Sequence, residues 1–495
     1  MAVRIRFPEP MESTVRLIEE TAPARLIAAA RARMATTSPA HLATASVLAV
    51  CRSSEIQIDH HGGPLHPVAG LHALLDAGAH AGMAEVAALQ SAALCNRHIH
   101  APEGGPYEMP ELSPKAVAPD AAAFLAALDH LLPGLAEKHL VALLAAGKRA
   151  EALGAMIEVA IRRQPIDDHY PIYLVHTMRT LDAIGWEWEE ALLRPVARWL
   201  AMCPISVVRG DSESKGFREK LDGFAAYDSF AALAEPLLAR PLRVESGPDE
   251  DKAVAALADD LARLEDFDAV PAPLAKAIGN GLSLAGACEA LGLAGASWHV
   301  RTNYGNPLDT HIQNGIAARR YLIARADVSL RQKLAALLTW HTGPESRVSM
   351  GRMVHTASPA GEYADLPTAP AALLSEMERL IASRPADKEA TKTGAGRGAM
   401  RCGPKERRPL AMADAFLAKG GAPSTLVAAL ARLVLRDDAT ELHSVSGFHD
   451  AVDLYETSRG PNRARHLISA TKIVLLGHGF GQDVWAEAAP RQAAE

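Results

Sequence analysis

The chain has 495 residues, of which 49% are hydrophobic and 22% charged, and its net charge is −7. This composition is ordinary for a globular protein with a sizeable core, and the acidic balance gives no reason to expect a nucleic-acid partner, which requires a basic face. No apolar run reaches about 18 residues and the N-terminal stretch has no apolar signal region, so we expect no membrane span and no secretory signal. The five cysteines stand singly without a CxxC motif, which favours a reducing, cytoplasmic location.

The predicted secondary structure is almost entirely helical. Alanine and leucine dominate, and apolar residues recur at three- and four-residue spacing in stretches at 121–147, 189–203, 251–267, 330–340 and 422–435. The pattern predicts an all-α fold of about fifteen to twenty helices, packed as one large helical domain with a central His-lined cavity. This domain is expected to span residues 1–480, with 1–205 and 215–480 as alternative sub-halves.

Three stretches interrupt the helical pattern. Residues 98–118 are rich in proline and glycine, and residues 204–216 read as a connector. Residues 384–409 are basic, glycine-rich and poor in large apolar side chains, which predicts a flexible loop. For this loop the sequence leaves two roles open, a solvated surface insertion and an active-site flap.

Histidine is the residue type that stands out. The segment DHHGGPLHPVAGLHALLDAGAH at 59–80 carries five histidines, and three later segments share its layout of an acid two residues before a histidine, at a loop-to-helix junction. These acids and histidines are Asp59 with His61, Asp167 with His169, Asp309 with His311, and Glu441 with His443. An acid at such a junction can cap the helix, and the histidine then projects from the first turn.

The number of these acid-x-His pairs exceeds the chance expectation. Given 58 acids and 20 histidines among 495 residues, about two pairs are expected, whereas the chain has five, including Glu137 with His139. Four helix starts pointing into one cavity would bring four imidazoles together, and neutral imidazoles bind iron, zinc, copper and nickel. The alternative for each histidine is a capping or satisfied core residue. The predicted metal ligands are His61, His66, His169, His311 and His443.

The other histidines of the first segment receive different roles. His66 and His72 are six residues apart and point to different helical faces, so His72, like His60 and His80, is assigned to capping or packing. His176 lies two turns after His169 on the same face, and it is a candidate for catalytic proton transfer. His449 is a second such candidate.

A polar, irregular segment leads into His311. Within it, Arg301, Asn303 and Tyr304 are candidate substrate-binding residues, with an ordinary interhelical loop as the alternative. No GxG signature follows a predicted strand and the HExxH and GxSxG motifs are missing, so no nucleotide cofactor, zincin protease or serine hydrolase is expected.

With its four histidine segments in order, the chain resembles the questin oxidase-like family, whose members are long, nearly all-helical proteins of fungal and bacterial secondary metabolism. The resemblance covers most of residues 40–480 and rests on HGGPLHPVAGLHALLDAG, DHYPIYLVHTMRTLDAIGWEWEEALLRPVARWLA, LDTHIQNGIAARRYLI and ELHSVSGFHDAVDLYE. It implies O₂-dependent oxidative cleavage of aromatic polyketides, with non-haem iron held mainly by histidines. The chain departs from the family's acid-x-His-x-x-Lys pattern at Ser446, where His449 could substitute as a ligand or base.

The sequence leaves three functions open. The first is a metal-dependent oxygenase in which Fe(II) is the favoured metal, with zinc, manganese, copper and nickel as alternatives, and whose partners are O₂ and a small organic molecule. The second is a metal-dependent hydrolase or lyase, in which the metal would lower the pKa of a bound water. The third is a helical binding or scaffold protein with structural histidines. The oligomeric state is left open, with a homodimer as one possibility.

Overall fold

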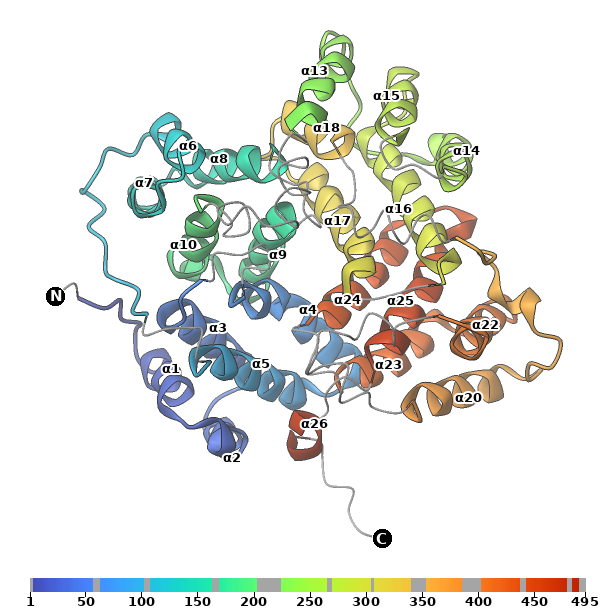
Figure 1. Cartoon of the computed structure of the whole chain (residues 1–495), viewed down its shortest axis with the longest axis horizontal. Coiled ribbons are helices and arrows are strands. Elements are labelled where there is room, and N and C mark those ends of the chain that lie inside the picture. The colour runs from blue at the N-terminus through green and yellow to red at the C-terminus, as the bar shows by residue number, and fades with distance from the viewer. Residues whose placement is uncertain are drawn as a thin grey trace, which may run out of the picture. The chain divides into compact units, whose positions relative to one another are not determined.

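The structure, a computed structural model, describes residues 3–56, 63–101, 107–162, 169–202, 224–264, 269–303, 307–339, 353–384, 402–436, 442–478 and 483–488. These residues form 22 α-helices and, apart from two isolated β-bridges, no extended strand pairing (Figure 1). The predicted all-α fold is therefore confirmed. None of the helices in the described ranges is long and apolar enough to cross a membrane.

The chain divides into two compact units. The first comprises Met1–Gln164, His169–Asp222 and Asp483–Glu495, and the second comprises Pro165–Asp168 and Gly223–Gln482. The helices of the first unit are α1 (Met11–Glu20), α2 (Pro23–Met34), α3 (Pro39–Ser53), α4 (Leu65–Ala81), α5 (Ala84–Ile99), α6 (Ala121–Asp129), α7 (Pro133–Ala145), α8 (Arg149–Arg162), α9 (His169–Ile184), α10 (Glu189–Leu200) and α26 (Asp483–Ala488).

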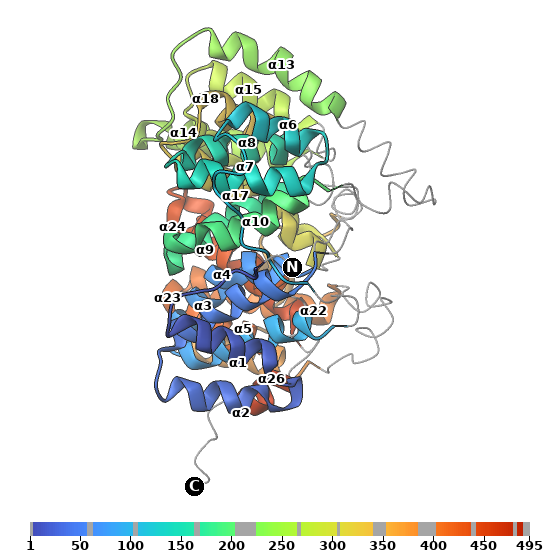
Figure 2. The same cartoon turned by 90° about the vertical axis from the view of Figure 1, so that its left-hand side faces the viewer.

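At the centre of the first unit lies α3. Its N-terminus is fixed by Ser38, whose hydroxyl accepts the backbone N–H of His41, and by a proline in the first turn. From Leu42 to Arg52 every residue is buried, so this part of the helix has no solvent-exposed face and is enclosed by α1, α4 and α5. Figure 2 shows these helices stacked together, with α26, from the other end of the chain, beside α2 and α5.

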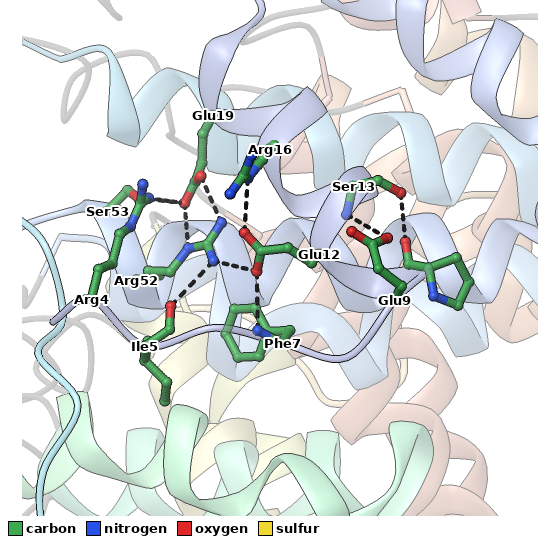
Figure 3. Close-up of polar contacts among 11 residues, drawn as sticks. Arg4, Ile5, Phe7, Glu9, Glu12, Ser13, Arg16, Glu19, Arg52 and Ser53 are labelled. Carbon is green, nitrogen blue, oxygen red and sulfur yellow. Dashed lines mark hydrogen bonds and ion pairs between the residues drawn. The ribbon is translucent and has the colours of Figure 1, made fainter.

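One ionic cluster ties the N-terminal segment to α3 (Figure 3). The Arg52 side chain is only 1% exposed and donates to Glu12 at 2.6 Å and to Glu19 at 2.8 Å. The backbone N–H of Phe7 donates to the same Glu12 carboxylate at 3.0 Å. Burial raises the pKa of Glu12, but the Phe7 N–H and the Arg52 guanidinium outweigh it and lower the pKa to about 2.

The second unit is built around α16. Its helices are α13 (Phe224–Leu238), α14 (Asp251–Ala262), α15 (Pro271–Gly279), α16 (Leu284–Arg301), α17 (Pro307–Ala324), α18 (Leu330–Leu338), α20 (Pro370–Ala382), α22 (Pro404–Ala418), α23 (Pro423–Val434), α24 (His443–Thr457) and α25 (Ala464–Gly477). Almost every residue of α16 is buried, and it contacts α14, α17 and α25. Gly295 permits this packing, because an added Cβ would lie 2.5 Å from the Cδ1 of Ile316 on α17.

The range predicted as a flexible loop, 384–409, is partly helical. Residues 385–401 lie outside the described residues, but α22 begins at Pro404, and proline favours the first helical turn. Arg407, three residues further, is 1% exposed and donates to Glu362 and, at 2.7 Å, to the carbonyl of Val300 near the end of α16. The loop prediction fails here because Arg407 has a buried partner that the local composition does not reveal.

Candidate functional site

The helix pair α4 and α9 carries the predicted ligands of the first unit. His66 is the second residue of α4, just after a turn in which Gly63 has a φ of 40°, and His169 is the first residue of α9. Both histidines therefore lie at helix starts, as expected for His169. His66 is 6% exposed and His169 is 2% exposed. Imidazoles at such depth are shielded from water.

His66 and His169 face each other within this pair. Their ring centroids lie 6.0 Å apart in an edge-to-face arrangement, and each ring offers a nitrogen within 4.8 Å of a nitrogen of the other. The Nδ1 of His66 lies 3.0 Å from the carbonyl oxygen of Gly63, which can only accept. Nδ1 therefore carries the proton and Nε2 keeps its lone pair, the form that binds a metal.

Tyr173, one turn after His169, completes this group. Its hydroxyl lies 2.9 Å from the Nε2 of His66, to which it donates, and its ring contacts that of His169 at 5.3 Å. The edge of Trp199 on α10 packs against Tyr173 at 5.0 Å and holds it in place. Sequence reasoning missed Tyr173, although its i, i+4 spacing from His169 places both on one helical face. We call His66, His169 and Tyr173 the α4–α9 cluster.

A second histidine pair lies further along the same two helices. The rings of His72 and His176 lie edge to face with centroids 5.0 Å apart, and the Nδ1 of His72 donates to the carbonyl of Ala69 at 2.8 Å. The Thr180 hydroxyl accepts the backbone N–H of His72 and donates to Val68. Six or seven residues of helix span about 9–10 Å, so this pair is too far from the α4–α9 cluster to share one ion with it.

The second unit contains another histidine pair, formed by His311 on α17 and His443 at the start of α24. Their ring centroids lie 5.3 Å apart. Further along the helices, the Asn314 amide donates to the buried carboxylate of Asp450 at 2.7 Å. Gly447 lets the two helices approach, because a Cβ there would lie 2.9 Å from the Cβ of Thr310. His449, next to Asp450, is partly exposed.

The structure describes some of the remaining predicted site residues and not others. His61 and Tyr304 lie outside the described residues. Arg301 donates to the carbonyl of Ala262 at 2.9 Å, so one of its nitrogens caps the end of α14. The Oδ1 of Asn303 is buried and accepts no hydrogen bond within the described residues. His80, assigned to capping or packing, lies in the last turn of α4, 3.5 Å from Asp76.

The two predicted halves of the four-histidine site thus form pairs, each within its own unit. His66 contacts His169, and His311 contacts His443. The convergence of all four rings in one cavity stays a prediction.

Comparison with known proteins identifies no relative of the chain. No family model matches the chain, and no curated protein or solved structure is significantly similar to it. The resemblance to the questin oxidase-like family therefore stays a prediction as well.

A further buried polar group lies at the end of α16, and sequence reasoning missed it. The ammonium of Lys472, on α25, donates to the carbonyl oxygens of His299 and Thr302 at 2.6 and 2.9 Å and to the Thr302 hydroxyl at 2.6 Å. Burial, with the nearby Lys472 charge, lowers the pKa of His299 well below its usual value, so His299 is neutral at pH 7. No acid precedes His299, so the acid-x-His pattern could not find it.

Proposed function

We propose that this protein is a metal-dependent oxidoreductase, an oxygenase with iron as the favoured metal, and that the α4–α9 cluster binds the ion. The observation that carries the proposal is the buried pair of His66 and His169, with ring nitrogens within 4.8 Å of each other. Two nitrogens bound to one ion at about 2.1 Å lie at most about 4.2 Å apart, so a small side-chain rotation suffices.

The chemistry of these donors suits such an ion. Imidazole nitrogen is a preferred ligand of iron, zinc, copper and nickel. A metal-binding histidine commonly donates its other ring N–H to a carbonyl or carboxylate, which fixes the tautomer, and Gly63 supplies that carbonyl to His66. His61, on the far side of the Gly62–Gly63 turn in the sequence, is the proposed third ligand.

The cluster would also control protons. A bound iron would supply the activation of O₂, leaving coordination positions open for O₂ and substrate. In the free protein the Tyr173 hydroxyl donates to the Nε2 of His66, so Tyr173 would lose this acceptor on metal binding and could donate its proton toward the bound substrate. His176 and His449 are the proposed proton carriers. The substrate class, a small and possibly polyketide-like aromatic molecule, rests on the family resemblance alone.

A structural role for the histidines is the second candidate, and one observation favours it. His66 and His72 both donate Nδ1–H to the carbonyl three residues earlier, at 3.0 and 2.8 Å. Such a bond also satisfies a buried histidine that binds nothing. On this account the protein would be a helical binding protein without a metal.

Metal analysis by mass spectrometry of protein purified without chelators separates these functions. About one iron per chain, together with O₂ consumption measured by an oxygen electrode on addition of candidate aromatic substrates, supports the oxygenase. Stoichiometric zinc with no O₂ consumption favours the hydrolase or lyase. Folded protein that holds no metal, and that binds none of Fe(II), Zn(II), Mn(II), Cu(II) and Ni(II) on titration, leaves only the binding protein.

A further inference from the structure

The second unit contains a cavity that no predicted site residue lines. Its volume is about 490 Å³, within the usual range for small-molecule sites. It is bounded by parts of α16, α17 and α18, by the segment before α14 and by the end of α24. Val244, Ala285 and Ile323 give it apolar walls, and five charged side chains line the rest, namely Glu245, Glu289, Arg320, Lys333 and Arg459.

Two of these charged groups already have hydrogen-bond or ion-pair partners within the protein. The Glu289 carboxylate accepts the backbone N–H groups of Arg459 and Gly460 at 2.6 and 3.1 Å. The Arg459 guanidinium donates to Asp251 at 3.2 Å and to the Ser246 hydroxyl at 2.6 Å. Neither group therefore needs a ligand to balance its charge.

Lys333 differs from these two groups in its contacts. Its side chain belongs to a residue only 6% exposed, and its ammonium makes no hydrogen bond or ion pair with any described residue. The nearest acid along the chain, Asp327, is bound to Arg325 at 2.6 Å. Burial lowers the pKa of Lys333, and the Asp327 carboxylate, which is engaged by Arg325, offsets this only in part. A buried cation without a partner is costly, and a bound anion would offset that cost.

Arg320 provides a second cation on the same cavity wall. Its one hydrogen bond among the described residues goes from Nη2 to the carbonyl of Thr457, at 3.3 Å. The rest of its guanidinium is available for an anion. Against these two cations stands one exposed carboxylate without an ion pair in the described parts of the chain, that of Glu245.

We propose that this cavity binds a small organic carboxylate, with its carboxylate held by Lys333 and Arg320 and its apolar body against Val244, Ala285 and Ile323. The charge balance favours one negative charge over two. Once Glu289 and Arg459, which have partners within the protein, are set aside, Lys333 and Arg320 face the single carboxylate of Glu245, so a phosphate dianion would leave an excess of negative charge. The proposal is independent of the metal site in the first unit.

The test uses probes of one length and different charge, with the full-length protein. Binding of hexanoate, hexan-1-ol and hexylammonium is measured by isothermal titration calorimetry at pH 7.5. We expect hexanoate to bind, and the K333M variant to weaken that binding by about tenfold or more, the usual cost of losing a charge-assisted hydrogen bond. The matched control is K276M, which removes an exposed lysine of α15 that does not line the cavity and should leave the affinity unchanged.

A second measurement needs no variant. Brief acetylation with acetic anhydride, read by peptide mass spectrometry, should modify Lys333 in the free protein, and hexanoate should protect Lys333 but not Lys276. The proposal is overturned if acetate, butyrate, hexanoate and benzoate all bind no better than their neutral alcohols. Equal hexanoate affinity in folded K333M and wild type also overturns it, as does a lack of protection of Lys333.

Discussion

The imidazole rings of His72 and His176 meet edge to face, 5.0 Å apart, and repeat along α4 and α9 the contact that His66 makes with His169. Both residue numbers increase from one pair to the next, so the two helices run in the same direction where they touch. The two pairs share a helix interface but differ in their surroundings. In the first pair, the hydroxyl of Tyr173 is hydrogen-bonded to the ring of His66.

Removing either histidine of the first pair tests which pair binds the metal. In H66A and in H169A we expect the affinity for Fe(II) to fall by about tenfold or more, because a ligand is lost at a site that takes three or four. The measurement is metal content after dialysis, with far-UV circular dichroism to show that the helices remain. The same measurement on H311A and H443A tests the predicted four-histidine site.

Two controls sharpen this experiment. H80A removes the histidine that pairs with Asp76 at the end of α4 and should leave metal binding unchanged. H72A removes a buried histidine of the second pair, so it has a packing cost similar to that of H66A. If H72A loses as much metal as H66A, the assignment to the α4–α9 cluster is wrong.

The Glu12 carboxylate makes the first unit sensitive to acid. Because its folded pKa is about 2 and its ordinary value 4.5, the stabilisation is complete above pH 4.5 and is lost as the pH falls toward 2. A shift of this size corresponds to about 3 kcal/mol of the free energy of unfolding. The measurement is the urea midpoint at a series of pH values.

The variant E12Q should flatten that pH dependence and lower the stability at pH 7 by about 3 kcal/mol, because the buried Arg52 loses one of its two carboxylate partners. E9Q is the matched control. Among the residues that the structure describes, Glu9 accepts one exposed hydrogen bond, from the Ser13 N–H at 3.3 Å, so its change should stay within about 0.5 kcal/mol. Equal effects of the two variants would contradict the role given to the ionic cluster.

Local patterns predicted the helices and the positions of histidines at their starts, since helical periodicity and capping depend on nearby residues. The start of α9 at His169 is an example. The pairing of rings depends on which helices pack together, and this is not encoded locally. Helical geometry places His72 about 120° around the helix from His66, which predicts a capping or packing role for it. Both rings nevertheless contact histidines of α9. This is possible because His66 and His72 can lie about 60° to either side of the line along which α4 packs against α9.

Because tertiary packing is not encoded locally, the partners of two buried charged residues could not be predicted either. Arg407 belongs by composition to a basic, glycine-rich stretch, yet it is buried against Glu362, which lies 45 residues earlier in the chain. Lys472 was not singled out either, because the carbonyl groups that it binds belong to the backbone and leave no mark on the sequence. Tertiary partners of single charges remain the part of the fold that one sequence does not reveal.

The K472M variant tests the polar group at the end of α16. Lys472 is fully buried, and its three N–H donors meet three acceptors on His299 and Thr302. Methionine keeps the length of the side chain but leaves these acceptors unsatisfied, so we expect a loss of about 3 kcal/mol or more in the free energy of unfolding. K419M, at the exposed end of α22, should change it by less than about 0.5 kcal/mol. A stable K472M protein would show that the group is dispensable.

The variant G447A, which adds a single methyl group, tests the close contact of α17 and α24. An alanine Cβ at position 447 would lie 2.9 Å from the Cβ of Thr310, which is not the movable end of a side chain, so the helices must separate. We expect G447A to cost about 1–3 kcal/mol and, by moving His311 away from His443, to weaken any metal binding that depends on them. The control is G134A in α7, where an added Cβ meets nothing within 4 Å. There the higher helix propensity of alanine should raise the stability by about 0.5–1 kcal/mol. Thermal unfolding measures both variants, and a G447A protein as stable as G134A would contradict the close approach of the two helices.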